Sequence, residues 1–163
     1  MSEQNKQIVD GAIQALFSTG DVDAVERYMT PDFVNHDPFP QTPGTREGFK
    51  ETAAMIREAV PDWHSTLHLL IAEDDLVAEH FTAGGTHRGE IFGIAPTGNH
   101  VHMDGINIFR LRDDLLEELR NPIPRPGPGP DPGPLMKRAA RTSLRFAADP
   151  ASRVGLNPQP LPP

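Results

Sequence analysis

Three side chains that could carry acid/base chemistry lie close together near residue 104. Asp104 stands in a run of apolar residues, where a carboxylate is unexpected because burial disfavours its charged form. Strand alternation would place His100 and His102 on the same face as Asp104. Desolvation raises the pKa of a carboxyl group in an apolar pocket, so it can serve as a general base near neutral pH. Asp104 is therefore the leading candidate for a catalytic base, and the alternative is that this face is the solvent side of the strand.

Other side chains could hold a substrate or stabilise a negatively charged oxygen. His87 ends a predicted strand on the face that carries Phe81, where it is either a second catalytic residue or a hydrogen-bonded structural histidine. His36 lies in a proline-rich loop and could reach the mouth of a pocket or satisfy backbone groups of that loop. Asn107 has the opposite parity to Asp104, so only a β-bulge between them would bring both side chains to one face.

An apolar pocket also needs walls, and the aromatic residues are candidates for them. Trp63, Phe81 and Phe92 could contact an aromatic ligand, although aromatic residues also build ordinary core. His102 joins them as a substrate-binding candidate because it shares the predicted face of Asp104. These four residues complete the set of candidate contacts with a ligand.

The same histidines raise the question of a metal site. His100, His102 and Asp104 would place imidazole and carboxylate ligands on one strand face, which is chemically compatible with a divalent metal. No glutamate follows the His-x-His pair as in a cupin site, and helices that precede the strands do not suit a jelly roll. We therefore expect no bound metal.

The elements that position these residues follow from the hydrophobic period. A helical period predicts one helix over about residues 4–18, a short second helix that ends near Met29, and a third between Thr45 and Pro61, with a loop over residues 35–45. A period of two then predicts strands over residues 63–71, 76–86, 101–111 and 115–119. In the first of these strands, alternation places five residues on one face, namely Trp63, Ser65, Leu67, Leu69 and Ile71. Helices followed by hairpin-connected strands predict an α+β fold, with the helices on one face of an antiparallel sheet.

Composition divides the chain in two. Residues 122–163 hold 12 of the 18 prolines, so we expect one domain over residues 1–120 and a Pro-rich, largely disordered tail over residues 121–163. The tail ends in a string that resembles a polyproline ligand, but composition alone produces such strings, and an inert tail is favoured. The chain carries a formal net charge of −8 and no cysteine, which argues against nucleic-acid binding, disulfides and a cysteine nucleophile. Without a membrane-spanning apolar run or a signal-like N-terminus, we expect a cytoplasmic protein.

Three segments carry a resemblance to a known family. They read DFVNHDP at Asp32–Pro38, GTHRGEIFGIAPTG at residues 85–98 and GINIFR at residues 105–110. These segments resemble the SnoaL-like polyketide cyclases, or ester cyclases, of the nuclear-transport-factor-2-like superfamily, over about residues 5–118. The resemblance implies a cone-shaped, bent antiparallel sheet around a pocket that N-terminal helices close at one end. It also implies dimerisation through the sheet and no cofactor.

The resemblance assigns roles to particular residues. His87 matches a Thr-His-x-Gly position where a pocket histidine is expected, and His36 matches the family's Asn-His-Asp-Pro loop. A catalytic aspartate is implied in the region of the sheet that contains Asp104. Residues 113–120 depart from the family because they lack its Asp-Gly turn and its His-Trp pair. The last strand is therefore expected to be short or altered.

The function implied by the resemblance is an intramolecular aldol-type ring closure by general acid/base catalysis on a small hydrophobic or aromatic carbonyl compound. Asp104 would be the base, and His87 with His36 or Asn107 would orient the substrate and stabilise the enolate. The alternative is a non-catalytic module of the same superfamily that binds a small ligand or dimerises. A hydrolase or isomerase of this superfamily is a third reading, although Asp104 and Arg110 do not supply the Asp/Arg/Asp set of its epoxide hydrolases.

Overall fold

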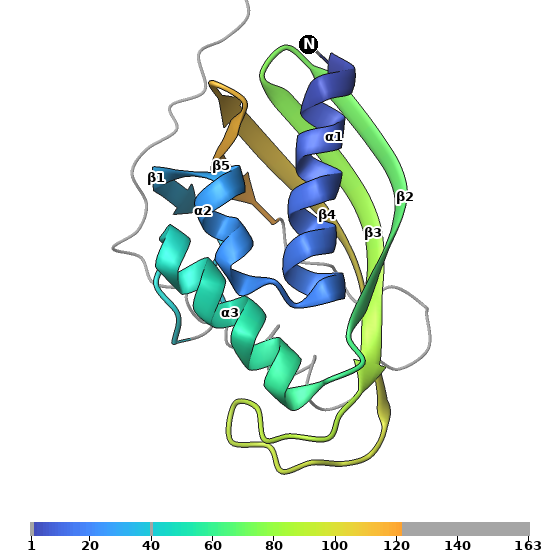
Figure 1. The fold of residues 1–163 in the computed structure, drawn as a ribbon. Helices are drawn as coiled ribbons and strands as arrows, with labels where there is room; N and C mark the ends of the chain where they lie inside the picture. Colours follow the sequence, from blue (N-terminus) through green and yellow to red (C-terminus); the bar gives the residue numbers. More distant parts are fainter. Residues whose placement is uncertain (1, 40, 122–163) are drawn as a thin grey trace, which may run out of the picture.

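The computed structural model describes residues 2–39 and 41–121, and in it a curved sheet carries the helices on one side (Figure 1). In chain order the elements are α1 (Ser2–Ile13), the π-helical segment η1 (Gln14–Thr19), the 3-10 turn η2 (Val22–Ala24), α2 (Val25–Tyr28), β1 (Met29–Asn35), α3 (Arg46–Ala59), β2 (His64–Glu73), β3 (Leu76–Thr86), β4 (His100–Arg112) and β5 (Leu115–Arg120). The predicted α+β class, with helices before the antiparallel strands, is confirmed.

The sheet has five strands in the order β1-β5-β4-β3-β2. Strands β2 to β5 pair antiparallel with their sequence neighbours, and β1 pairs parallel with β5. The predicted final strand is confirmed as β5, which pairs on both of its sides and completes the sheet despite the departure from the family pattern at residues 113–120. The sheet therefore keeps a continuous inner wall under the helices.

Strand β1 differs from the prediction, which extended the second helix to Met29 and began a loop at residue 35. The structure ends α2 at Tyr28 and places Met29–Asn35 in a strand with both ends buried. Proline lacks the N–H group that a sheet ladder needs, but Pro31 is tolerated here because β1 is an edge of the sheet. The pairing partners lie more than eighty positions away in β5, so no local pattern could indicate them.

Strand β2 changes face part of the way along its length. Its register with β3 shifts between Leu67 and Leu69, which marks a β-bulge. Leu69 and Ile71 consequently lie on the outer face of the sheet, where they are 52% and 58% exposed. The prediction that these two residues share one face of the strand with Trp63 and Ser65 is wrong, because strict alternation cannot anticipate an inserted residue.

Helix α3 forms as predicted and covers one end of the inner face. Thr45 caps its first turn, because the Thr45 hydroxyl accepts a hydrogen bond from the Gly48 N–H at 3.2 Å. Phe49, Ala53 and Ile56 are buried on the side of the helix that faces the sheet. Together with α1 and η1, this helix closes an apolar core over the strands.

Two expectations concern parts of the chain at the limits of the description. The predicted Pro-rich tail begins at residue 121, and residues 122–163 lie outside the described residues. Among the residues that the structure describes, no helix is both long and apolar enough to span a membrane.

Candidate functional site

A small cavity lies between the inner face of the sheet and the helices. All five strands, α1, η1 and α3 contribute to it, and its volume is about 60 Å³. The walls are mostly apolar and aromatic, and a few polar side chains reach them. The residues that line the cavity are Ile13, Phe17, Asn35, Asp37, Phe39, Phe49, Thr52, Ile56, Trp63, Ser65, Phe81, Ala83, Met103, Asn107, Leu119 and Asn121. An apolar cavity with convergent polar groups is the usual form of a small-molecule site.

A buried carboxyl group lies beside this cavity. Glu79 of β3 and Asn107 of β4 are register partners on the inner face, and the Asn107 Nδ2 group donates a hydrogen bond of 2.8 Å to Glu79 Oε2. Glu79 is only 1% exposed. Burial raises the pKa of Glu79 to about 7, the hydrogen bond from Asn107 acts in the opposite direction, and the charge of Asp10 on α1 raises the pKa further. Glu79 can therefore gain or lose a proton near neutral pH.

Asp104, the base predicted from the sequence, lies on the other side of the sheet. The β3–β4 register runs without a shift from Asp104 to Asn107, so no bulge reverses the alternation and the two side chains point to opposite faces. The Asp104 side chain is 62% exposed, and its Oδ1 lies 3.5 Å from His80 Nε2. Because Asp104 faces away from the cavity, its geometry gives no support to a role as the base. His102 shares this exposed face and likewise does not line the cavity.

His87 is buried, but it does not line the cavity. Its Nδ1 lies 3.1 Å from the Thr97 hydroxyl, and the His87 backbone N–H and C=O bond to the residues Asn99 and Gly98 of the connection between β3 and β4. Its Nε2 has no hydrogen-bond partner within the described part of the chain. These contacts suit the structural alternative that the sequence left open, since the ring anchors the long connection at the end of β3.

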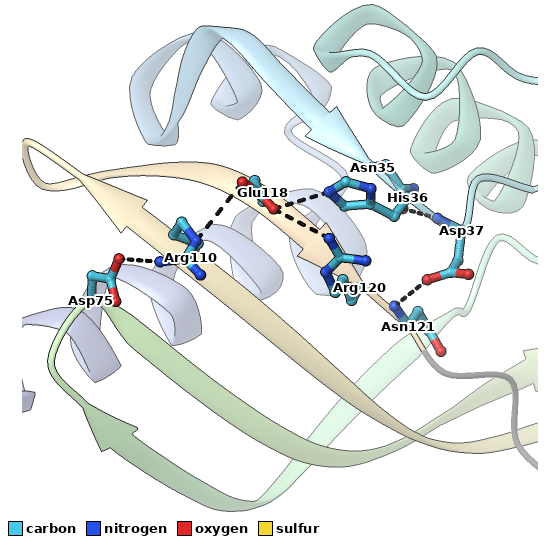
Figure 2. Close-up of polar contacts among 8 residues, drawn as sticks. All are labelled: Asn35, His36, Asp37, Asp75, Arg110, Glu118, Arg120 and Asn121. Atoms are coloured by element: carbon cyan, nitrogen blue, oxygen red, sulfur yellow. Dashed lines mark hydrogen bonds and ion pairs between the residues drawn. The ribbon is translucent and has the colours of Figure 1, made fainter. Parts of the chain in front are cut away.

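His36 lies on the surface, while the residues on either side of it face the cavity. The His36 Nε2 atom is 3.0 Å from Glu118 Oε2, and the His36 backbone N–H donates to the Leu119 carbonyl. Figure 2 shows that Glu118 also lies between Arg110 and Arg120. These contacts fasten the loop after β1 to β5.

The neighbours of His36 form a polar rim at one end of the cavity. The backbone N–H of Asp37 donates to Asn35 Oδ1, and the Asp37 carboxylate accepts a hydrogen bond of 3.0 Å from the backbone N–H of Asn121 (Figure 2). Asn35, Asp37 and Asn121 all line the cavity. His36 therefore positions this rim and does not itself reach the cavity.

The predicted aromatic walls are partly correct. Trp63 and Phe81 line the cavity. Phe92 stands one ring further out, where it stacks on the cavity residue Phe39 with ring centroids 6.0 Å apart and the planes almost parallel. Gly105 lies opposite Phe81 in the register, and a Cβ atom there would approach the Phe81 ring to 3.0 Å. The absence of a side chain at Gly105 thus gives Phe81 its place in the wall.

Sequence reasoning missed Glu79, which was the most consequential residue of the site. A signal for it existed, because Glu79 has the same strand parity as the apolar residues Val77, Phe81 and Ala83, which are all buried. A charged residue on the buried face of a strand is as unexpected as a charged residue in an apolar run. Asn35, Asp37 and Asn121 had no such signal, because the non-local pairing of β1 with β5 brings the ends of these two strands together at the cavity.

The described residues contain no group of three or more His, Cys, Asp or Glu side chains that could hold a metal ion. His100, His102 and Asp104 are each exposed on the outer face of β4. The polar groups that line or adjoin the cavity include the carboxyl groups of Asp37 and Glu79, together with amides and hydroxyls.

The chain matches one family model and shares its fold with solved structures. A model described as SnoaL-like polyketide cyclase matches residues 7–122. IdmH from Streptomyces antibioticus, provisionally named a polyketide cyclase, is 26% identical with a TM-score of 0.63, and the match covers 87% of this chain and 99% of IdmH. AclR from Streptomyces galilaeus, provisionally named a hydroxylase, is 21% identical with a TM-score of 0.68, and the match covers 86% of this chain and 98% of AclR.

A third structure is similar over a shorter part of the chain. TsrD from Streptomyces laurentii is 24% identical with a TM-score of 0.65, and the match covers 73% of this chain and 87% of TsrD. No curated protein sequence matches the chain. At these identities the solved structures establish a common fold, while the family model covers most of the chain.

Proposed function

Because the chain belongs to the SnoaL-like polyketide cyclase family, we propose that it is a cofactor-independent cyclase that closes a ring in a small hydrophobic carbonyl compound by general acid/base catalysis. Glu79 is the proposed base, in place of the Asp104 that the sequence suggested. The observation that carries the proposal is a carboxyl group only 1% exposed, with a pKa of about 7, bonded to the cavity residue Asn107. A base whose pKa lies near the working pH is most effective in proton transfer.

The proposed reaction is an intramolecular aldol addition in three steps. Ionised Glu79 removes a proton from a carbon next to a substrate carbonyl, which leaves an enolate and protonated Glu79. The enolate carbon attacks a second carbonyl of the same molecule, so a C–C bond forms and the second carbonyl oxygen becomes an alkoxide. Protonated Glu79 returns its proton to that alkoxide. The base is regenerated, and the product has the composition of the substrate.

The enolate oxygen needs hydrogen-bond donors, and two cavity residues can supply them. Asn35 Oδ1 already accepts a hydrogen bond from Asp37, which leaves Asn35 Nδ2 as a donor. Ser65 is buried on β2 and offers a hydroxyl to the cavity. Donors that are fixed before the reaction stabilise a developing negative charge without having to reorganise.

The size and walls of the cavity bear on the substrate. At about 60 Å³ it is smaller than the roughly 150 Å³ cavity that holds benzene in an engineered protein. The cavity must therefore widen to admit a ring. Phe39, which lines the cavity, and Phe92, which stacks on Phe39, are two aromatic side chains at its border. The mostly apolar walls favour a hydrophobic substrate.

A non-catalytic binding module of the same superfamily is the alternative, and one observation favours it. Glu79 is adjacent to the cavity but does not itself line it, so a substrate reaches Glu79 only if the cavity widens past Asn107. If the cavity does not widen in this way, the same walls would hold a hydrophobic ligand without reacting with it.

We further propose that two copies associate through the outer face of the sheet. That face exposes Leu69, Ile71, Leu76 and Ile106, which belong to the adjacent strands β2, β3 and β4. Exposed apolar residues that are contiguous usually mark an interaction surface. Sedimentation of the protein should show a dimer that Ile71→Arg converts to a monomer, and a wild-type monomer at high concentration would contradict the proposal.

Isotope exchange and ring closure test the proposed chemistry. In D₂O, the wild type should catalyse deuterium uptake next to the carbonyl of cyclopentanone, and it should close a linear diketone with three methylene groups between its carbonyls to a hydroxycyclohexanone. Loss of a general base lowers such rates by about a hundredfold to ten-thousandfold, which is the loss expected for Glu79→Gln. Asp104→Asn is the matched control on the other face and should retain the wild-type rate. Equal rates in Glu79→Gln and the wild type would contradict the assignment.

A further inference from the structure

The two amide atoms of Asn107 are in different situations. Nδ2 is held by Glu79 at 2.8 Å, whereas Oδ1 is buried and has no hydrogen-bond partner within residues 2–39 and 41–121. Asn107 is 6% exposed and lines the cavity. A buried acceptor without a partner is destabilising, and because Asn107 lines the cavity, a bound molecule is one possible source of the missing donor.

The protonation state of Glu79 decides which way this amide faces. An ionised carboxylate can only accept hydrogen bonds, so Asn107 must turn Nδ2 toward Glu79 and Oδ1 is left for the cavity. A protonated carboxyl carries an O–H donor, for which Asn107 Oδ1 is the adjacent acceptor. Rotation of the amide by half a turn then satisfies Oδ1 and leaves the N–H donors of Nδ2 for the cavity.

We propose that the Glu79–Asn107 pair switches the ligand selectivity of the cavity, with Asn107 presenting an acceptor when Glu79 is ionised and a donor when Glu79 is protonated. The ionised state selects apolar ligands that carry a hydroxyl donor, such as phenols and enols. The protonated state selects apolar ligands that carry only a carbonyl acceptor, such as ketones. This inference shares the site of the proposed function, but it concerns equilibrium binding and requires no turnover.

The surroundings of Glu79 allow both states near neutral pH. Asp10 on α1 is the charged group that faces Glu79 from the helical side, and its carboxylate disfavours a second negative charge. On the β2 side the register partner of Glu79 is Leu70, which carries no charge, and on the β4 side it is Asn107 itself. The pKa of Glu79 near 7 then places the change between the two states within the range of ordinary buffers.

The switch would also assist the proposed reaction. When Glu79 receives the proton from the substrate carbon, it becomes a donor for Asn107 Oδ1. Nδ2 is then released and can donate to the enolate oxygen that the same proton transfer has created. The donor would then be available to the enolate and not to the ketone, and only an interaction that stabilises the former more than the latter can raise the rate.

Equilibrium binding of three small probes tests the switch. Phenol carries a donor, acetophenone carries only an acceptor, and toluene carries neither, so toluene reports any general effect of pH on the opening of the cavity. Dissociation constants would be measured by calorimetry at about pH 5.5 and about pH 8.5, on either side of the Glu79 pKa. After correction by toluene, we expect the ratio of phenol to acetophenone affinity to rise by about tenfold toward the higher pH, since one hydrogen bond is gained and another is lost.

Two variants separate the switch from other effects of pH. In Glu79→Gln the pair carries no titratable group, so the affinity ratio should be independent of pH. Asn107→Leu removes the amide, so the ratio of phenol to acetophenone affinity should be the same at both pH values. That ratio should then reflect only the apolar parts of the two probes. If Asn107→Leu does not fold, Glu79→Gln still decides the question.

The outcomes distinguish this inference from the proposed function. A wild-type ratio that does not change with pH, or an equal change in Glu79→Gln, would overturn the switch. Failure of phenol and acetophenone to bind at either pH would also overturn it. None of these results would alter the isotope-exchange measurement, on which the proposed proton transfer depends.

Discussion

The two faces of one strand pair hold carboxyl groups in contrasting environments. On the inner face of β3 and β4, Glu79 is 1% exposed and bonds to the neutral amide of Asn107. On the outer face, Asp104 is 62% exposed at the side chain and lies 3.5 Å from His80. Both residues belong to the same pair of strands, so the difference in exposure between their carboxyl groups comes from the face of the sheet on which each side chain lies. Burial costs a carboxylate its hydration and raises its pKa, whereas an exposed carboxylate keeps its water.

The comparison also explains why the apolar run around Asp104 was misleading. Val101 and Met103 flank it in sequence, but in a strand those neighbours point to the opposite face. The relevant neighbours of a strand residue are those two positions away and those across the ladder. For Glu79 these include Val77, Phe81 and Asn107, which are all buried.

The largest expected difference between the faces is in packing. Phe109 of β4 faces inward and has no exposed surface, so Phe109→Ala should lower the free energy of unfolding by about 3–5 kcal/mol. Ile106 of the same strand faces outward and is 48% exposed in a single copy, so in the Ile71→Arg background, which we expect to be monomeric, Ile106→Ala should lower it by less than about 1 kcal/mol. Denaturant titration at several protein concentrations would measure both effects and reveal any contribution of a dimer. Similar losses for the two variants would contradict the assignment of the faces.

The second expected difference is in the pH dependence of stability. The Glu79 pKa is raised from its ordinary value of 4.5 to about 7, so between these values the folded protein binds more protons than the unfolded chain. Its stability therefore falls as the pH rises through this window, by roughly 3 kcal/mol in total. Glu79→Gln removes this loss and should be more stable than the wild type above pH 7, with little difference below pH 4.5.

Denaturant midpoints measured across this pH window would check the expectation. Asp104→Asn is the control, and its difference from the wild type should stay small at every pH because the side chain is mostly exposed. A Glu79→Gln variant that is less stable than the wild type at high pH would show that the ionised carboxylate stabilises the fold, contrary to the account.

The smallest expected effect concerns the outer pair itself. His80→Ala removes the partner of Asp104, and because both side chains are substantially exposed the free energy of unfolding should change by about 1 kcal/mol or less. Any such effect should diminish at high salt, which screens exposed charges. A larger change that is insensitive to salt, measured in the Ile71→Arg background that we expect to be monomeric, would contradict the exposed position of this pair.

Sequence patterns predicted much of the fold because its elements are locally coded. Neighbouring residues encode the period of two over β3 and β4, and they also encode the Thr45 cap and the apolar face of α3. Strand β1 is not encoded locally, because its partner β5 lies far away in the chain and Pro31 is unusual in a strand. The bulge in β2 is another non-local feature, since a single inserted position reverses the faces of Leu69 and Ile71.

The site was harder to predict than the fold. Asn107, Trp63 and Phe81 were among the candidates and do line the cavity. His36 and His87 matched the family's motifs, yet their side chains hold loops in place at positions outside the cavity. A motif records that a residue type recurs at a position, and it does not distinguish a side chain that contacts a ligand from one that positions the wall behind it. Glu79 was identifiable only when parity was applied to every residue of its strand.

A titration of the Glu79 carboxyl group by NMR tests the central claim most directly. The side-chain carboxyl ¹³C signal of Glu79 would be followed with pH, with Glu79→Gln used for its assignment. We expect Glu79 to titrate at about 7. A midpoint near its ordinary value of 4.5 would contradict the claim, because the inner face of the sheet would then not disfavour the charged form of the carboxyl group.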